Sequence, residues 1–173
     1  MNDMAHAVLR LLDENQIDYT LAEHPAVFNM EELYAQGLEH CDAIAKNLLV
    51  RDQKKCFYWL LVLYGEKRAD LKALKARLGH GALSLAGAEE LGTLLGLTPG
   101  SVTPFGALKD AAHRVTILLD EDYRGKLIGV HPCDNTATVF LPADRLAELL
   151  QQQDTAVEFI PFCAKQKTPP GRF

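Results

Sequence analysis

The sequence lacks any long hydrophobic run. No stretch of its 173 residues approaches the ~20 consecutive apolar residues that a membrane-spanning helix needs. The first residues, MNDMAHAVLRLLDENQ, place acids among the apolar positions and show none of the order of a signal peptide. We therefore expect a cytoplasmic protein without membrane contacts.

Cysteines are few, and their spacing follows no pattern. The four of them, Cys41, Cys56, Cys133 and Cys163, form no C-x-x-C motif and no Cys/His pair at the spacing of zinc ligands. We predict no metal and no other cofactor, and thiols that are free or buried. A catalytic cysteine, Cys56 or Cys133, stays open as an alternative.

The composition that remains is that of one globular domain. With 48% hydrophobic and 24% charged residues, a chain of 173 residues can bury a core and still hold a pocket. Its length fits a single domain, and we expect a monomer.

Charge is unevenly distributed along the chain. The net charge of −5 argues against nucleic-acid binding driven by overall charge. Between Arg51 and Arg77, however, eight basic residues and three acids leave a net charge of +5, so the remainder carries −10. This segment predicts either a positive face or a solvated helix with two turns, and charge alone does not choose between them.

Hydrophobic periodicity predicts both helices and strands. Helices are expected at 4–14, 30–37, 69–79, 86–97 and 143–153. Strands are expected at 17–25, 43–52, 56–65, 114–121, 126–132, 136–142 and 156–162. The strands at 43–52 and 56–65 should form a hairpin, and the second is apolar enough to be covered on both faces. Because strands and helices intermix irregularly, the pattern favours an α+β or mixed α/β fold.

Two polar residues interrupt apolar surroundings. Lys46 lies in the middle of a mostly apolar strand, where its ammonium needs water, a carboxylate or an anionic ligand. His131 begins HPCDNTATV at a strand end and could bind a ligand or act as a base. The alternatives are an exposed lysine on a strand edge and a half-buried histidine bonded to its turn.

The segment LTPGSVTPFG at 97–106 is an uncharged loop with two prolines and two glycines. Pro99-Gly100 suits a turn with positive φ, and Pro104 fixes the exit. Gly100 lacks a Cβ, so a ligand can approach its backbone closely. The alternative is a loop that only packs on the core.

Taken together, these features resemble the YbaK/prolyl-tRNA synthetase editing-domain family, and most of all its freestanding PrdX-type Ala-tRNA(Pro) deacylases. The shared features are Lys46-Asn47, DLK at 70–72, the GxxxP signature from Gly100 to Pro104, and HPCDNTATV. The resemblance implies a single α+β domain at 1–164, with a mixed, curved sheet flanked by helices. A flexible tail would follow at 165–173.

The resemblance also implies a reaction, the trans-editing hydrolysis of the ester that links a wrong amino acid, most of all alanine, to tRNA(Pro). The family's catalytic positions correspond to Lys46, Gly100 and His131. The expected substrate-binding residues are Asn47, Ser101, Pro104, Phe105, Asn135 and Thr136. The expected tRNA-binding residues are Lys54, Lys55, Lys67, Arg68, Lys72 and Lys75.

Such a site needs to position a water and stabilise an oxyanion, because an aminoacyl ester is already activated. We expect backbone N–H groups near Gly100 to face the developing charge, Lys46 to contact phosphate or ribose, and His131 to form the pocket wall. Alternatives are a deacylase for Cys-tRNA(Pro) or another small amino acid, and a non-catalytic tRNA-binding module. Besides mischarged tRNA(Pro), prolyl-tRNA synthetase is a candidate partner.

Overall fold

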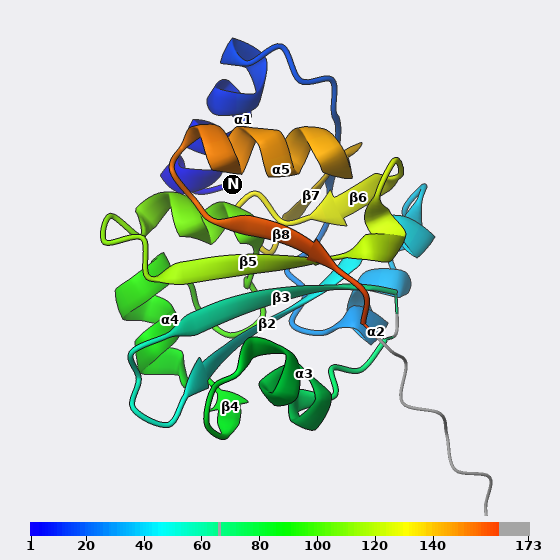
Figure 1. Ribbon diagram of the computed structural model, residues 1–173. Coiled ribbons are helices and arrows are strands. Elements are labelled where there is room, and N and C mark those ends of the chain that lie inside the picture. Colours follow the sequence, from blue (N-terminus) through cyan, green and yellow to red (C-terminus); the bar gives the residue numbers. More distant parts are fainter. Residues whose placement is uncertain (66, 163–173) are drawn as a thin grey trace, which may run out of the picture.

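The computed structural model describes residues 1–65 and 67–162, whose strands form two sheets (Figure 1). The larger sheet has the strand order β4-β2-β3-β5-β8, and the smaller has the order β1-β7-β6. The strands are β1 Thr20–Glu23, β2 Ala45–Asp52, β3 Tyr58–Tyr64, β4 Leu83–Leu85, β5 Val115–Asp120, β6 Leu127–Val130, β7 Ala137–Pro142 and β8 Val157–Ile160.

The larger sheet is mixed. β2 and β3 form an antiparallel hairpin, whereas β5 runs parallel to both β3 and β8. β3, with the sequence YWLLVLY, lies at the centre and is buried along almost its whole length. A bridge between Ile44 and Gly129 connects this sheet to the smaller one, which is antiparallel throughout. The two sheets therefore meet beside the start of β2.

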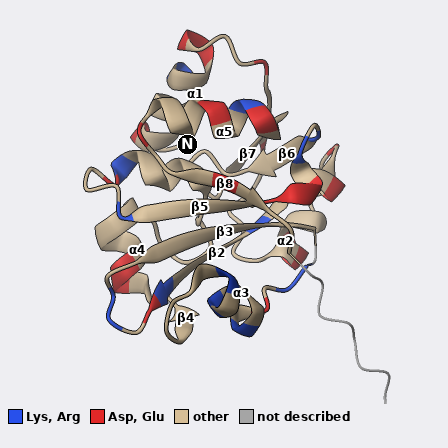
Figure 2. Cartoon of the chain, in the orientation of Figure 1, with Lys and Arg blue, Asp and Glu red and all other residues tan. Residues whose placement is uncertain are grey.

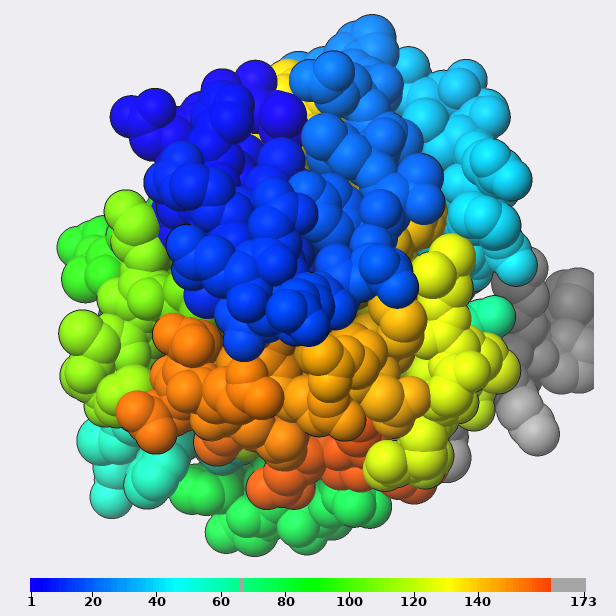
Figure 3. Space-filling view, turned by 90° about the horizontal axis from the view of Figure 1, so that it is seen from above, coloured from blue at the N-terminus to red at the C-terminus, as the bar shows by residue number. Residues whose placement is uncertain are grey.

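Helices cover both faces of the larger sheet. The α-helices are α1 Asp3–Glu14, α2 Met30–Tyr34, α3 Leu71–Leu78, α4 Ala88–Leu95 and α5 Ala143–Gln152. The 3₁₀ helices are η1 Cys41–Ala43, η2 Pro104–Lys109 and η3 Glu121–Tyr123. α3 packs on one face, while α1, α4, α5 and the smaller sheet share the main core on the other. α1 and α5 lie side by side over that side of the molecule (Figure 3).

The predicted α+β class with a mixed sheet flanked by helices is confirmed, and so is the hairpin of β2 and β3. The strand β4 was not predicted, and the loop at 97–106 runs into η2. The predicted tail at 165–173 lies outside the described residues, as does the end of the predicted domain. Among the residues described, no helix is long and apolar enough to cross a membrane.

Candidate active site

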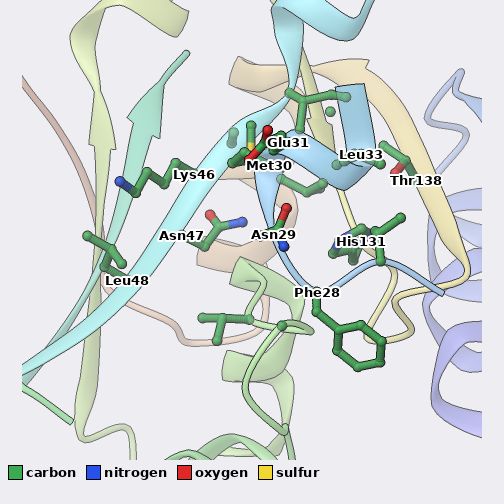
Figure 4. A pocket seen from close by; sticks show the side chains of 17 residues that line it. Phe28, Asn29, Met30, Glu31, Leu33, Lys46, Asn47, Leu48, His131 and Thr138 are labelled. Atoms are coloured by element: carbon green, nitrogen blue, oxygen red, sulfur yellow. The ribbon is translucent and has the colours of Figure 1, made fainter. Parts of the chain in front are cut away.

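A pocket of about 460 Å³ opens where the two sheets meet (Figure 4). Its walls are the segment from β1 to α2, the start of β2, the loop after α4, and the end of β6. Four of the predicted site residues line it together: Lys46, Asn47, Gly100 and His131. The volume is typical of a site for a small molecule or the end of a larger one.

Hydrogen bonds hold the loop at 97–106 in place. The Ser101 N–H donates to Thr98 O at 3.0 Å, and Ser101 Oγ donates to the same carbonyl at 2.9 Å. Gly100 lies within this turn, with φ of +90°. Further along, Thr103 Oγ1 donates to His131 O at 2.6 Å. This bond fixes the loop to the strand end that carries His131.

Three predicted substrate-binding residues of this loop lie behind the pocket wall. Pro104 starts η2 and is buried, and the Phe105 side chain is completely buried in the main core. Ser101 is also buried, and its hydroxyl closes the turn. None of the three lines the pocket. Their contribution is to anchor the loop.

The need for glycine at position 100 comes from a close approach within the protein. A Cβ built there would lie 3.2 Å from the Phe28 Cα and 3.3 Å from the Phe28 Cδ1. The positive φ also suits glycine better than any residue with a side chain. The sequence suggests that this glycine leaves room for a ligand; in the structure, the nearest atoms belong to Phe28, between β1 and α2.

The backbone N–H groups of this loop are not equally available. The Ser101 N–H is used within the turn, whereas no hydrogen bond joins the N–H of Gly100 or Val102 to another described residue. Gly100 and Val102 both line the pocket. They are therefore the donors in this loop that could stabilise an oxyanion.

Lys46 and Asn47 point to opposite faces of the larger sheet, because side chains alternate along a strand. Lys46 lies across from Leu63, which packs on the α3 side, and Asn47 lies across from Val62, which packs in the main core. Figure 4 shows the Lys46 ammonium directed away from Asn47. Both residues border the pocket because β4 pairs only with Val50–Asp52 and leaves this edge of β2 uncovered.

The Asn47 amide has hydrogen-bonding capacity to spare. Its Oδ1 is buried and has no hydrogen-bond partner among the described residues. An unpaired buried carbonyl oxygen costs about 1–3 kcal/mol. A ligand that donates a hydrogen bond to this oxygen, such as an ammonium group, would remove that cost.

His131 presents a neutral imidazole to the pocket. Its Nδ1 donates to Ala137 O at 2.7 Å, which leaves Nε2 as the acceptor of the ring. Burial lowers the pKa of His131, and His24, whose ring centroid is 5.9 Å away, lowers it further. His24 in turn contacts the buried Thr138 hydroxyl through Nε2 at 3.0 Å. The Nε2 atom of His131 can thus accept a hydrogen bond from a ligand or water.

Asn135 and Thr136 support the wall instead of lining the pocket. Asn135 Nδ2 donates to Val27 O at 3.0 Å, and the Val27 N–H donates to Asn135 O at 3.1 Å. Thr136 Oγ1 donates to Asp134 at 2.6 Å, and Thr136 O accepts the His24 N–H at 3.0 Å. These two predicted substrate-binding residues therefore hold the segment between β1 and α2 against the His131 loop.

The sequence around this pocket matches a known protein family. Residues 24–149 match the model of the aminoacyl-tRNA editing domain, a span that contains every wall of the pocket. The chain belongs to this editing-domain family. The family predicted from the sequence is thereby confirmed.

Two relatives match this chain over most of their own length, and the names of both refer to prolyl-tRNA. The prolyl-tRNA editing protein ProX of Acetoanaerobium sticklandii is 39% identical, over 86% of this chain and 92% of the relative. The prolyl-tRNA synthetase associated domain-containing protein 1 of Danio rerio is 33% identical, over 90% of this chain and 86% of its own length.

Solved structures agree with the fold of the editing domain. Hypothetical protein APE2540 superposes with a TM-score of 0.69 at 20% identity, over 87% of this chain and 95% of that one. The crystal structure of a candidate trans-editing enzyme for prolyl tRNA synthetase gives a TM-score of 0.68 at 23% identity, over 94% and 99%. At these identities the likeness concerns the fold alone.

The predicted tRNA-binding cations of the editing domain have two different environments. Five are exposed at the surface, namely Lys54, Lys55, Arg68, Lys72 and Lys75. Lys67 is only 18% exposed, and its Nζ lies 2.9 Å from Asp120 and 2.7 Å from Asp122. Although burial alone would lower the pKa of Lys67, hydrogen bonds to these two carboxylates raise it. The charge of Lys67 is therefore balanced within the protein.

Cys41, Cys56 and Cys133 do not line the pocket of the editing domain. Burial raises the pKa of the Cys133 thiol to about 12, so little thiolate forms at neutral pH. Cys56 is exposed, and its thiol lies 3.5 Å from the Lys54 carbonyl oxygen. Within residues 1–65 and 67–162, no three His, Cys, Asp or Glu side chains gather in a way that could hold a metal ion.

The sequence prediction missed the segment at 27–33, which forms a whole wall of the pocket. Part of this wall had a recognisable signal, because Asn29 directly precedes the helix predicted at 30–37 and is a residue type that caps helices. Its Oδ1 accepts the Glu32 N–H at 2.8 Å. Another signal was an aromatic residue in a connector, Phe28, which is 65% exposed. Thr138, inside β7, carried no signal that sets it apart from a core threonine.

Proposed function

We propose that this editing domain acts in trans on mischarged tRNA(Pro) and hydrolyses the ester of alanyl-tRNA(Pro). The observation that carries the proposal is the meeting of Lys46, Asn47, Gly100 and His131 around one pocket in a chain of this family. The names of the relatives, a prolyl-tRNA editing protein and a prolyl-tRNA synthetase associated domain protein, support tRNA(Pro) as the tRNA.

The pocket takes the aminoacyl group and the terminal adenosine in this proposal. Water adds to the ester carbonyl carbon, the bond to the ribose oxygen breaks, and the proton lost by the water ends on that oxygen. The free N–H groups of Gly100 and Val102 stabilise the oxyanion. Asn47 Oδ1 accepts from the α-ammonium group, and His131 Nε2 accepts from the water or a ribose hydroxyl.

Lys46 contacts the phosphate or ribose at the 3′ end of the tRNA. Its side chain lies on the α3 side of the larger sheet, away from the Asn47 amide. Lys72 and Lys75 are exposed on α3, on the same side (Figure 2). A row of cations on this side suits the phosphate backbone of the acceptor stem, to which Lys54, Lys55 and Arg68 also contribute.

The apolar part of the pocket favours a small amino acid. Its lining includes Val27, Leu33, Ile44, Val102 and Val130. Shape can exclude the ring of proline, but one methylene or a similar small group changes binding by only about 1–3 kcal/mol. Cysteine is therefore the competing substrate to test.

The test is single-turnover hydrolysis of Ala-tRNA(Pro), Cys-tRNA(Pro) and Pro-tRNA(Pro) by the wild type and Lys46→Ala. We expect loss of the alanyl ester only, strongly slowed by Lys46→Ala. Arg145→Ala, which removes an exposed cation from α5 on the far side of the sheet, is the matched control and should act as the wild type.

Faster cleavage of the cysteinyl ester would keep the reaction and change the amino acid. Binding of tRNA without cleavage of any ester would reject the deacylase and leave a tRNA-binding module. Restoration by Lys46→Arg would support contact with phosphate through charge.

A further inference from the structure

Three aromatic rings form a cluster at the turn end of the β2–β3 hairpin. The centroid of Phe57 lies 4.5 Å from that of His80 and 6.2 Å from that of Trp59, with which it is stacked at 22°. Trp59 and His80 are also in contact, at 4.9 Å. Trp59 is buried, whereas Phe57 leaves 51% of its surface to solvent. Phe57 is thus an exposed ring held in place by two others.

This cluster lies on the same face of the larger sheet as Lys46. Trp59 packs with Leu63 and with Leu74 of α3 in the hydrophobic cluster on the α3 face of the sheet, and Leu63 is the cross-strand neighbour of Lys46. Leu63 lies six positions after Phe57 in the sequence, which corresponds to about 20 Å along a strand. Lys46 and Phe57 therefore mark the two ends of one face, a span that several nucleotides can cover.

The charges near the cluster favour an anionic partner. Lys54 in the hairpin turn and Arg77 at the end of α3 are exposed, and neither forms an ion pair with a described residue. The carboxylates nearby are already engaged. Asp52 is buried and accepts backbone N–H groups of the turn at 2.8 and 3.0 Å, and Glu90 pairs with Arg51 at 2.9 Å.

We propose that Phe57, supported by His80 and Trp59, is a stacking site for a nucleobase of the tRNA acceptor end. The inference rests on the proposed function, in which tRNA is the substrate. An exposed, fixed ring with exposed cations in the same hairpin turn and at the end of α3 suits a chain that carries both planar bases and phosphates. The pocket holds the aminoacyl end, and Phe57 fixes the nucleic acid at a second point.

The test compares Phe57→Leu, which keeps an apolar side chain, with Phe57→Tyr, which keeps an aromatic ring. Binding of uncharged tRNA(Pro) is followed by fluorescence anisotropy at fixed salt. We expect Phe57→Leu to weaken binding about 5- to 100-fold and Phe57→Tyr to restore it. In hydrolysis, the loss should appear in KM far more than in kcat.

Leu85→Ala is the matched control, because Leu85 is an exposed apolar residue of the same sheet, at 57%, outside the ring cluster. It should bind tRNA as the wild type does. A second readout comes from Trp59, the single tryptophan of the chain. Its emission should change on titration with uncharged tRNA(Pro), with the same midpoint as the anisotropy.

Wild-type affinity in Phe57→Leu, together with unchanged Trp59 emission, would overturn the proposal. An equal loss of tRNA affinity in Leu85→Ala would also overturn it. The same holds if Phe57→Leu loses affinity only when prolyl-tRNA synthetase is present, because the surface would then bind a protein. In each of these outcomes the wild type still cleaves its ester. If the wild type neither binds tRNA nor cleaves any ester, the proposed function fails first.

Discussion

His131 connects the chemistry of the pocket to the stability of the fold. Burial lowers its pKa, so just below the ordinary histidine value of about 6.5 the unfolded chain binds more protons than the folded one. Above about pH 6.5, neutral His131 makes its full contribution to the free energy of unfolding. This contribution is lost as pH falls through the lowered pKa of the folded state. We predict that acidification from about pH 7 to about pH 5 lowers the urea midpoint of the wild type more than that of His131→Gln.

His24 and Asp134 are the other titratable groups that act on His131, and both are retained in this variant. His6→Gln, which removes an exposed histidine of α1, is the control and should keep the pH dependence of the wild type. Parallel curves for the wild type and His131→Gln would contradict the prediction.

Gly100 permits a second prediction at the scale of one residue. Gly100→Ala would put a Cβ at φ of +90° and 3.2 Å from the Phe28 Cα. We expect a loss of about 1–3 kcal/mol in the free energy of unfolding, because both the dihedral angle and the contact are strained. Deacylation should fall about 100-fold if the loop N–H groups serve the oxyanion. Urea unfolding and single-turnover hydrolysis measure the two effects.

Gly96→Ala is the matched control for this substitution. Gly96 ends α4 with φ of +65°, and a Cβ there would meet only the flexible Lys109 side chain. A similar loss of stability with retained hydrolysis is expected. Equal losses of activity in both variants would mean that strain alone, and not the place of Gly100 in the pocket wall, explains the effect.

At the scale of elements, one ion pair joins the segment after β3 to the end of β5. Lys67 Nζ lies 2.9 Å from Asp120, which is completely buried and also accepts the Tyr64 N–H. We predict that Lys67→Ala lowers the free energy of unfolding by about 3 kcal/mol, because it leaves a buried carboxylate without its cation. Lys72→Ala, an exposed change on α3, should stay within about 0.5 kcal/mol of the wild type in the same urea titration.

Two results would oppose this account of Lys67. One is unchanged stability of Lys67→Ala together with weaker tRNA binding, which would return Lys67 to the nucleic-acid surface. The other is a double variant, Lys67→Ala with Asp120→Asn, that is no more stable than Lys67→Ala alone. Removing the uncompensated charge should recover part of the loss.

The elements that the sequence predicts well are those with a clear period or a long apolar run. β3 is one, because seven consecutive apolar and aromatic residues form a central strand. β4 is the opposite case, since LSL is too short to show an alternation. The parallel pairing of β5 with β3 and β8 joins segments far apart in the chain, and local patterns hold no information about it.

At the scale of the whole molecule, the family resemblance predicts candidate site residues, and the fold decides which of them line the pocket. Lys46 and Asn47 follow one another in sequence, yet strand alternation places their side chains on opposite faces. Phe105 lies inside the signature loop, but its side chain belongs to the core. Lys67 counts toward the basic segment, although its partner Asp120 lies in another strand and balances its charge. A count of charges along the sequence therefore overstates the positive face.

The same reasoning leads to a prediction about salt. If Lys72 and Lys75 contact phosphates, each releases counterions on binding, and the slope of log Kd against log salt should fall by about one for each lysine removed. We expect this for Lys72→Ala and for Lys75→Ala in anisotropy titrations with tRNA(Pro) over a series of KCl concentrations. The net charge of −5 makes the test informative, because overall charge cannot supply the attraction.

Two variants, one of an arginine and one of a lysine, are the controls for the salt measurement. Arg145→Ala removes a cation that pairs with Glu148 on α5, and Lys67→Ala removes one that is neutralised inside the protein. Neither should change the salt slope, although the second should lower stability. Equal slopes for Lys72→Ala and the wild type would remove α3 from the proposed path of the acceptor stem. A changed slope in Arg145→Ala would instead indicate that the tRNA reaches the opposite side, because a cation that neutralises a phosphate releases counterions on binding.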